Sequence, residues 1–519
     1  MTATQWLIFF LLMNIWHFLM YCCFYKRAGY PAWYALIPFY NAYILTKIIN
    51  RPWWWFILLY IPVVNLLMAA VYWFQVLEVF GKNTLKDKIL VLVTLGLYLV
   101  YLNFFEAKNL PYRPEHDDKE TLLGSIVFAV IAATLVHVFA FQPFIIPTPS
   151  LEKSLLVGDF LFVSKLHYGP RVPMTVVSVP MVHDTVPVLK VKSYMDRPQL
   201  PYMRLPGFQK PKRFEIVVFN WPADTVEQFF TVSKKRIRKP IDKKSNYVKR
   251  LVGLPGDTIQ VKDGILYVNG RRARYPDRTE LQHNYVLQLK KGKGIGKRHF
   301  KRIKEKYRFD LRYAETARMN DSTFVINMTR KVADYLSRLP EVDTVYMYLD
   351  TLRHDKVFPG TGWWSMDNFG PLYIPKKGDK VRLDRKNYLL YKKLLEEYET
   401  GQPLTENKVE WKDGMAYING KPVKEYTFKQ DYYWMMGDNR NRSEDSRIWG
   451  FVPWTHIVGK PVFIWMSWDK NDKRIRWERV FTTVHGKGER RSYLIPFLLL
   501  VLAYYGWAKY RKKKRKDAR

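Results

Sequence analysis

Apolar residues in this chain are gathered into long runs, and these runs constrain the fold more than any other feature. Four lie in the first part of the sequence, at about 5–24, 53–80, 89–105 and 122–141, and a fifth occupies 492–508. About 20 apolar residues in an α-helix span the hydrocarbon core of a bilayer. We therefore predict an α-helical membrane region over 1–141 with about four transmembrane helices, and a C-terminal one. A buried core helix is the alternative for each run.

Basic residues beside these runs indicate an orientation, because Lys and Arg in short loops favour the cytoplasmic side. The tail 509–519, KYRKKKRKDAR, is strongly basic and is expected inside the cell. Five spans then place residues 1–4, which contain no Lys or Arg, outside, and the four basic residues of 25–52 inside. The three lysines of 82–88 fall outside, against the rule. The scheme makes 142–491 one extracytoplasmic region.

Charge and cysteine content limit the function classes. The 519 residues include 84 Lys and Arg against 47 Asp and Glu, a net charge of +37, which suits nucleic acid, anionic lipid or a cytoplasmic anchor. The only cysteines, Cys22 and Cys23, lie in an apolar run, so no disulfide framework or cysteine zinc site is possible beyond it. We expect no metal and no cofactor.

One basic stretch, KGKGIGKRHFKRIKEK at 291–306, contains residue types that bind phosphates or nucleic acid. A solvated loop, or one that lies against anionic lipid, is the favoured interpretation. No nucleic-acid partner is therefore predicted.

The region 142–491 is predicted to be mainly β. Segments 214–221, 258–270 and 461–468 are rich in β-branched and aromatic residues and are bounded by turn formers. KDGILYVNGRR at 262–272 is echoed by KDGMAYINGKP at 412–422, and each copy contains the DG and NG pairs that favour tight hairpins. Between the copies we place an insertion, 276–407, with a helical stretch at 388–398.

Three stretches of this region contain residues suited to chemistry: IPTPSLEKSLLVGDF with Ser150, NYVKRLVGLPGD with Lys249, and GDNRNRSEDSRIWGFVP at 437–453. A serine hydroxyl needs a base to become a nucleophile, and none of the ten histidines lies in these stretches. A lysine can serve if burial lowers its pKa from about 10.4 towards neutrality. The alternative for Lys249 is a strand lysine whose amine reaches solvent.

Together with FEIVVFNWP at 214–222, these three stretches resemble the four ordered sequence boxes of the bacterial type I signal peptidases. The resemblance covers 144–254 discontinuously and then 431–468. It does not extend to the additional N-terminal runs or to most of the insertion. It implies a signal-peptidase-like β fold for the catalytic domain.

The resemblance assigns roles residue by residue. Ser150 is the nucleophile and Lys249 the general base of a Ser-Lys dyad. Thr148, with the Ser150 N–H, would form the oxyanion hole, and Ser443 would orient the lysine amine. Four charged residues would brace the site: Arg250, Asp438, Asp445 and Arg447. Five residues would line the pocket for a small P1 side chain: Ile146, Leu151, Leu155, Tyr247 and Val248.

Three positions depart from the family pattern. Leu151 stands where Met is common, Lys153 where Pro is common, and Glu215 where the family usually has Gly-Asp. The first two are expected to change the P1 pocket or the nearby backbone, and neither belongs to the dyad.

The implied function is that of a membrane-bound serine endopeptidase that removes N-terminal signal peptides from exported preproteins, after small residues of the Ala-X-Ala type. Its partners would be preproteins and membrane lipid, at the outer face of the bacterial cytoplasmic membrane. A catalytically silent membrane scaffold that binds exported chains is an alternative, and a self-cleaving Ser-Lys regulator is another. The joint presence of Ser150, Lys249, Thr148 and Ser443 favours the enzyme.

Overall fold

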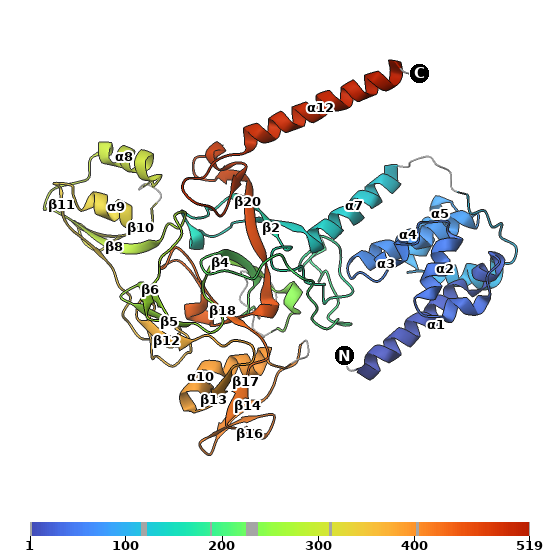
Figure 1. Ribbon diagram of the computed structural model, residues 1–519, viewed down its shortest axis with the longest axis horizontal. Coiled ribbons are helices and arrows are strands. Elements are labelled where there is room, and N and C mark those ends of the chain that lie inside the picture. The colour runs from blue at the N-terminus through green and yellow to red at the C-terminus, as the bar shows by residue number, and fades with distance from the viewer. Residues whose placement is uncertain are drawn as a thin grey trace. The chain divides into compact units, whose positions relative to one another are not determined.

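The computed structural model describes residues 3–115, 122–186, 189–224, 237–310, 314–400 and 404–517. The last two residues of the predicted basic tail lie outside these ranges. The chain divides into two compact units (Figure 1). The smaller contains Met1–Phe139 and Val172–Met203, and the larger contains Ala140–Arg171 and Arg204–Arg519.

The smaller unit is helical. Its helices are α1 (Ala3–Arg27), α2 (Tyr40–Ile48), α3 (Trp55–Leu58), α4 (Val64–Val79), α5 (Leu85–Val93), α6 (Leu97–Tyr101) and α7 (Leu122–Phe139). Large aromatic side chains fill much of the core, among them Tyr25, Tyr72 and Phe80. The described residues of the segment Val172–Met203 form no helix and include short β-bridges such as Thr175 with Gln199.

The predicted spans are continuous in only part of this unit. Among the described residues α1 alone is a single helix long and apolar enough to cross a membrane, and a bent pair raises the number to two at most. The predicted span 53–80 is two helices, α3 and α4, because Pro62 and the positive φ of Val63 (74°) interrupt it. The span 89–105 is bent by 110° where Leu95 and Gly96 have positive φ.

The end of the chain is helical too. Helix α12 (Leu494–Asp517) contains the fifth predicted apolar run and continues through most of the basic tail. Its described residues do not form a helix that is both long enough and apolar enough to span a membrane.

The larger unit is mainly β, as predicted. Its central antiparallel sheet has the order β1 (Phe141–Ile145), β2 (Asp159–Ser164), β20 (Ile457–Asp469), β3 (Ile216–Asn220), β4 (Asn246–Gly253), β18 (Tyr432–Met436) and β19 (Val452–Pro453), with β21 (Arg474–Ile475) and β22 (Thr482–Thr483) also paired with β20. Every residue of β3 and β18 is buried, which is the expected outcome for short, continuous apolar runs bounded by turns.

The internal echo forms two similar three-stranded units. The first is β5 (Thr258–Lys262), β6 (Ile265–Val268) and β7 (Arg271–Arg272), and the second is β14 (Val409–Lys412), β15 (Met415–Ile418) and β16 (Lys421–Val423). In each of the four turns both central residues, Asp-Gly or Asn-Gly, have positive φ between 47° and 79°. That is the type I′ turn, whose twist matches that of antiparallel strands. The hairpin prediction is confirmed.

The predicted insertion contains a further sheet. Its order is β11 (Val342–Met347), β8 (Gln282–Leu289), β10 (Thr323–Thr329) and β9 (Thr316–Arg318). Helices α8 (Lys297–Tyr307) and α9 (Arg330–Leu336) pack on it through Ile303, Val332 and Leu336, and Figure 1 shows both helices beside its strands. This part therefore has a hydrophobic core of its own.

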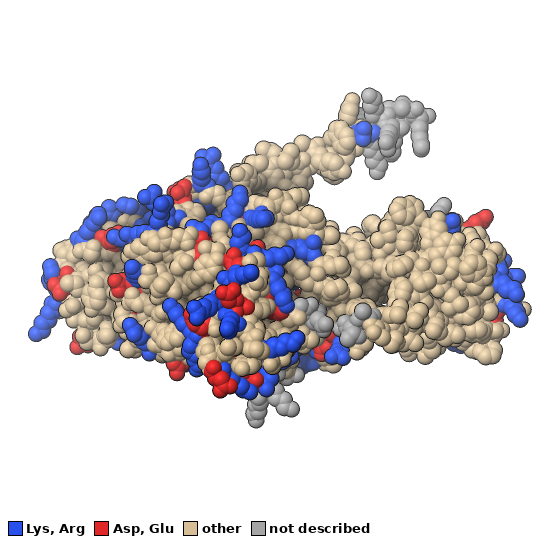
Figure 2. Space-filling model, turned by 60° about the horizontal axis from the view of Figure 1, so that its bottom comes forward, with Lys and Arg blue, Asp and Glu red and all other residues tan. Residues whose placement is uncertain are grey.

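The rest of the insertion joins neighbouring sheets. Strand β12 (Phe369–Tyr373) pairs with β5, and β13 (Lys380–Arg382) pairs with β17 (Glu425–Thr427). The predicted helical stretch is α10 (Arg385–Lys393), continued by a π-helical turn at Leu394–Tyr398. Figure 2 shows that Lys and Arg outnumber Asp and Glu on the visible face of the larger unit.

Candidate active site

Ser150 lies in a tight turn between the first two strands of the central sheet. Thr148 is extended, with φ −125° and ψ 153°, and caps a short 3₁₀ helix at Pro149–Leu151. The proline at the first helical position favours this turn because its φ is already restricted to helical values. Ser150 is only 6% exposed, and its carbonyl oxygen accepts a hydrogen bond from the Asn439 N–H at 3.1 Å.

Lys249 reaches this serine from the middle of the sheet. It lies on β4, directly opposite Val217 of β3, and is 4% exposed. Its Nζ is 2.7 Å from Ser150 Oγ, a hydrogen-bonding distance. The same amine is 5.3 Å from the centroid of the Tyr247 ring. Two residues 99 positions apart in sequence, which are predicted to be nucleophile and base, thus lie within hydrogen-bonding distance of each other.

The surroundings of Lys249 disfavour its charged form. Burial lowers the pKa of the Lys249 amine to about 8, although the carboxylates of Asp445 and Glu444 act in the opposite direction. A substantial fraction of the amine is therefore neutral near pH 8. A neutral amine has a lone pair with which to accept the serine proton.

Two ion pairs flank the dyad. The Asp445 carboxylate accepts hydrogen bonds from Nε and Nη2 of Arg447, both at 2.9 Å. Its Oδ2 also accepts a hydrogen bond from the Gly437 N–H at 3.0 Å. Burial alone would raise the pKa of Asp445, but the charge and hydrogen bonds of Arg447 hold it below its ordinary value. Asp445 also caps α11 (Ser446–Trp449). This carboxylate therefore organises the loop that follows β18.

The second pair is Arg250 with Asp438, in which Nε donates to Oδ1 at 2.7 Å and Nη2 to Oδ2 at 2.5 Å. Arg250 Nη1 donates to the Phe214 carbonyl at 2.6 Å. All four charged residues predicted to brace the site thus form two bidentate pairs.

Ser443 does not make the hydrogen bond expected of it. Its Oγ is buried and is bonded to no residue that the structure describes. A Cβ at Gly437 would lie 2.2 Å from Ser443 Oγ and 2.6 Å from the Ser150 carbonyl oxygen. Ser443 therefore lies beside the nucleophile's backbone, but the structure contains no bond from its hydroxyl to the Lys249 amine. Gly437 was missed by sequence reasoning, although its place directly before Asp438, in a stretch that resembles a family box, was a usable signal.

Four of the five predicted P1-pocket residues share one cluster. Ile146, Leu151 and Leu155 are buried in it, and Val248 packs against it from β4. Tyr247, the fifth, points to the other face of β4 and stacks on Trp221 at 4.9 Å between ring centroids. The opposite faces follow from strand geometry, in which neighbouring side chains alternate.

The three departures from the family pattern have local partners. Leu151 is buried in the same apolar cluster. Lys153 Nζ donates to the Arg308 carbonyl at 3.0 Å and lies 4.9 Å from the Phe309 ring centroid. Glu215 pairs with Lys460 at 2.6 Å. Lys153 thereby connects the turn after the nucleophile to the insertion.

Comparison with known proteins finds two matching family models. Residues 119–332 and 376–468 match the family model described as signal peptidase, peptidase S26. Residues 33–110, in the helical unit, match the model of a family of unknown function.

Three curated relatives are distant in sequence. The chain is 25% identical over 350 residues to signal peptidase I of Buchnera aphidicola, with 67% of this chain and 76% of the relative covered. It is 25% identical over 357 residues to that of Rickettsia typhi, with 67% and 82% covered. For that of Helicobacter pylori the identity is 24% over 380 residues, with 70% and 92% covered. Because the S26 model matches more than half of the chain, the chain belongs to the signal peptidases of family S26 and is a serine endopeptidase.

Proposed function

We propose that this protein removes signal peptides with Ser150 as the nucleophile and Lys249 as the general base. The observation that supports this most directly is the 2.7 Å separation of Lys249 Nζ and Ser150 Oγ at a buried position. A catalytic base must lie within hydrogen-bonding distance of the proton it removes, and its pKa must be close to the working pH. A pKa of about 8 for Lys249 meets the second condition.

The reaction proceeds in two halves. Ser150 Oγ attacks the scissile carbonyl carbon while its proton passes to Lys249 Nζ, and negative charge develops on the carbonyl oxygen. The C–N bond then breaks, and the new amino terminus of the mature chain leaves with the proton from the Lys249 ammonium. A water molecule next attacks the acyl ester, again with Lys249 accepting a proton. Release of the signal peptide carboxylate restores Ser150.

Thr148 is the proposed side-chain donor to the developing oxyanion, together with the Ser150 N–H. Pro149, which lies between them, has no N–H to contribute. The Thr148 hydroxyl is partly exposed and makes no hydrogen bond within the described part of the chain. It is therefore available to a substrate oxygen.

Specificity for small P1 and P3 residues is proposed from the apolar cluster beside the nucleophile. Ile146, Leu151 and Leu155 are 4%, 1% and 0% exposed, so they are already closely packed. A closely packed aliphatic wall excludes bulky or charged P1 side chains, because neither can be accommodated without displacement or desolvation. We infer an Ala-X-Ala preference.

We further propose that the protein is a multi-pass protein of the bacterial cytoplasmic membrane, with the peptidase domain on its outer face. Helix α1 supports membrane insertion, and the basic residues beside the apolar runs support the orientation. A reporter active only in the cytoplasm should give signal when fused after Arg519 and none when fused after Asn407. The opposite pattern would exclude this topology.

The enzymatic proposal is tested by incubating the purified full chain with a preprotein and sequencing the new amino terminus. We expect one cut after a small residue, and no cut by the Ser150→Ala variant under the same conditions. Appreciable cleavage by that variant would exclude Ser150 as the nucleophile. A silent scaffold would leave the preprotein intact in both samples.

A further inference from the structure

A cavity of about 990 Å³ lies within the larger unit, apart from the Ser150–Lys249 pair. Four segments contribute to its walls: residues 152–157 after the nucleophile, 304–310 at the end of α8, 469–476 around the β20–β21 turn, and 488–490. Neither Ser150 nor Lys249 lines it. Pro149 and Asn439, which adjoin Ser150, do line it, so the cavity borders the catalytic turn but does not contain the Ser150–Lys249 pair itself.

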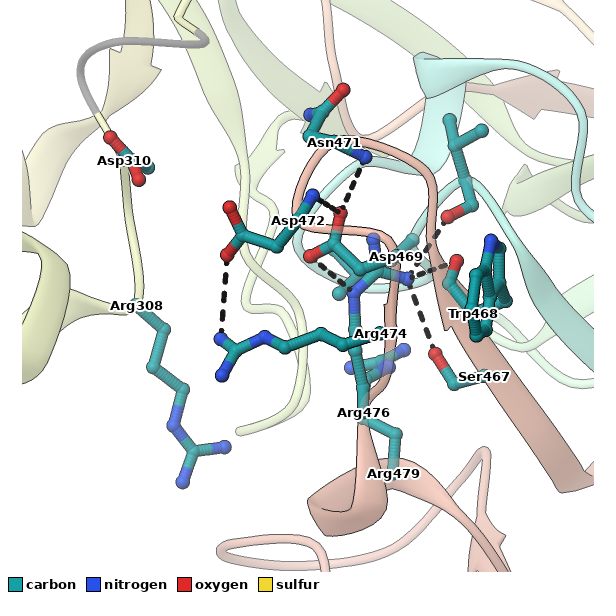
Figure 3. A network of polar contacts seen from close by, with 12 residues as sticks. Arg308, Asp310, Ser467, Trp468, Asp469, Asn471, Asp472, Arg474, Arg476 and Arg479 are labelled. Atoms are coloured by element: carbon teal, nitrogen blue, oxygen red, sulfur yellow. Dashed lines mark hydrogen bonds and ion pairs between the residues drawn. The ribbon is translucent and has the colours of Figure 1, made fainter.

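Cationic side chains predominate in the lining, with twelve Lys or Arg against nine Asp or Glu. The charges on the β20–β21 turn are largely paired with one another. Arg476 Nε is 3.1 Å from Asp469 Oδ2, and its Nη1 donates to the carbonyl of Val157 at 3.0 Å and to Ser467 Oγ at 3.2 Å (Figure 3). This wall is held together by its own hydrogen bonds.

Three other cations of the lining have few hydrogen-bond partners or none among the described residues. The Arg308 guanidinium forms no ion pair or hydrogen bond with any described residue, and Figure 3 shows it without a contact to the residues drawn. The Lys306 amine contacts the Tyr307 ring at 5.6 Å and has no carboxylate partner among described residues. Arg490 donates one hydrogen bond, to the Ser154 carbonyl, and its buried Nε has none within the described chain.

Burial at the cavity wall also disfavours the charged forms of two basic side chains. Burial, followed by the nearby Arg479, lowers the pKa of Arg490 to about 9. Burial likewise lowers the pKa of Lys153. Arg490 is half-buried, whereas Lys306 and Arg308 are exposed at the mouth of the cavity, and Arg308 lies close enough to act on the Arg490 charge. Like charges repel one another, and an anion placed among them would stabilise their charged forms.

We propose that this cavity binds a phosphate-bearing anion through Arg308, Lys306 and Arg490. Arginine offers a planar fork of donors that matches phosphate oxygens, and lysine adds a mobile point charge. The anion has two possible sources, free phosphate and the head group of an anionic lipid. The lipid source is suggested by chain position, because Arg490 comes four residues before Leu494, where the apolar helix α12 begins.

The test is calorimetric titration of the detergent-solubilised full chain with inorganic phosphate, with dihexanoyl phosphatidylglycerol and with dihexanoyl phosphatidylcholine. Two double variants are compared. Lys306→Gln with Arg308→Gln removes two cavity cations, whereas Lys297→Gln with Arg298→Gln removes two exposed cations from the other end of α8, outside the lining. Each removes two positive charges, one pair from the C-terminal end and C-cap of α8 and the other from its N-terminal end, and preprotein cleavage by each reports that it is folded.

We expect saturable binding of phosphate, of phosphatidylglycerol or of both, with Kd raised at least about tenfold in the cavity variant and changed less than about twofold in the control. Equal affinities for phosphate and phosphatidylglycerol would assign the site to phosphate itself. Tighter binding of phosphatidylglycerol, with none of phosphatidylcholine, would assign it to an anionic head group. The proposal would be overturned if no saturable binding were found, if Kd rose equally in both variants, or if Kd for both ligands were unchanged in the cavity variant.

Discussion

Lys249 and Arg250 are neighbours on one strand, are 4% and 3% exposed, and have opposite surroundings. Arg250 meets a carboxylate that matches its fork, with two hydrogen bonds to Asp438. Lys249 meets the hydroxyl of Ser150, and its carboxylate neighbours act on it without a salt bridge in the described structure. Alternation along β4 directs the two side chains to opposite faces of the sheet.

The difference teaches how burial produces two distinct results. A buried cation with a bidentate counter-ion remains charged and braces the structure, although its net contribution to stability is small. A buried cation that faces a neutral hydroxyl has a lowered pKa, which makes it suitable for the role of general base that we propose for Lys249. Arg250 and Lys249 are buried to nearly the same depth, and what distinguishes them is that only Arg250 is paired with a carboxylate, that of Asp438.

The largest effect is expected from abolishing the base. Lys249→Ala should reduce kcat by about 10⁴–10⁶-fold, as for other residues that act as part of a catalytic unit. Lys249→Arg should do nearly as much, because an arginine stays protonated at this position and cannot accept the serine proton. Single-turnover cleavage of a preprotein measures both. Near-normal turnover by Lys249→Arg would show that proton acceptance is not the role of this residue.

The next prediction concerns Arg250, the residue compared with Lys249. Asp438→Asn would leave Arg250 buried without its counter-ion, which typically costs about 3–5 kcal/mol of unfolding free energy. Thermal unfolding in detergent should show a clearly lower Tm. Asp321→Asn, in the exposed pair with Arg318, is the matched control and should leave Tm unchanged. Equal Tm values for the two variants would mean that the Arg250 pair does not brace the fold.

A third change sharpens the comparison on the serine side. Thr148→Val keeps the shape of the side chain and removes the hydroxyl, so we expect kcat to fall about 10²–10³-fold, or roughly 3–4 kcal/mol, with little change in KM. Thr148→Ser should retain much of the activity. Steady-state kinetics on one preprotein gives both constants. Parental kcat in Thr148→Val would remove this hydroxyl from the oxyanion hole.

The smallest effect is the pH dependence, and its sign follows from the pKa of Lys249, about 8. Below this pKa the amine is protonated and inactive as a base, so the rate should fall about tenfold for each pH unit. Above it the amine is neutral and the rate should level off. Cleavage of a substrate with no titration of its own, measured from pH 6 to 10, tests this. A flat profile would argue against a lysine base.

Local features of this chain could be predicted well from sequence. The turns at Asp263-Gly264 and Asn419-Gly420 depend on backbone preferences of those two residues alone. The Ser150–Lys249 pair was predicted only from the resemblance to a family, because local sequence preferences give no information about a contact between residues so far apart in sequence.

Features that depend on long-range packing could not be predicted in this way. Leu95 adopts a positive φ inside an apolar run whose composition indicates uninterrupted helix, whereas the break at Val63 was already signalled by Pro62. Ser443 lies near the Ser150 backbone without a bond to Lys249, because close packing against Gly437 determines its position. The cavity brings together residues 152–157, 304–310 and 469–476, and no local sequence rule places these three segments beside one another.

The pairing of β2 with β20 has a consequence for the order of folding. Asp159 lies opposite Ser467, so the strand that follows the nucleophile turn finds its partner about 300 residues later. The two hairpin units need only local contacts and can form early, whereas closing the central sheet must wait for the end of the domain. Asn439, which bonds the Ser150 carbonyl, also belongs to the late part. A chain emerging from synthesis therefore contains Ser150 long before the residues that contact it, so the candidate site is assembled only when almost all of the domain is present.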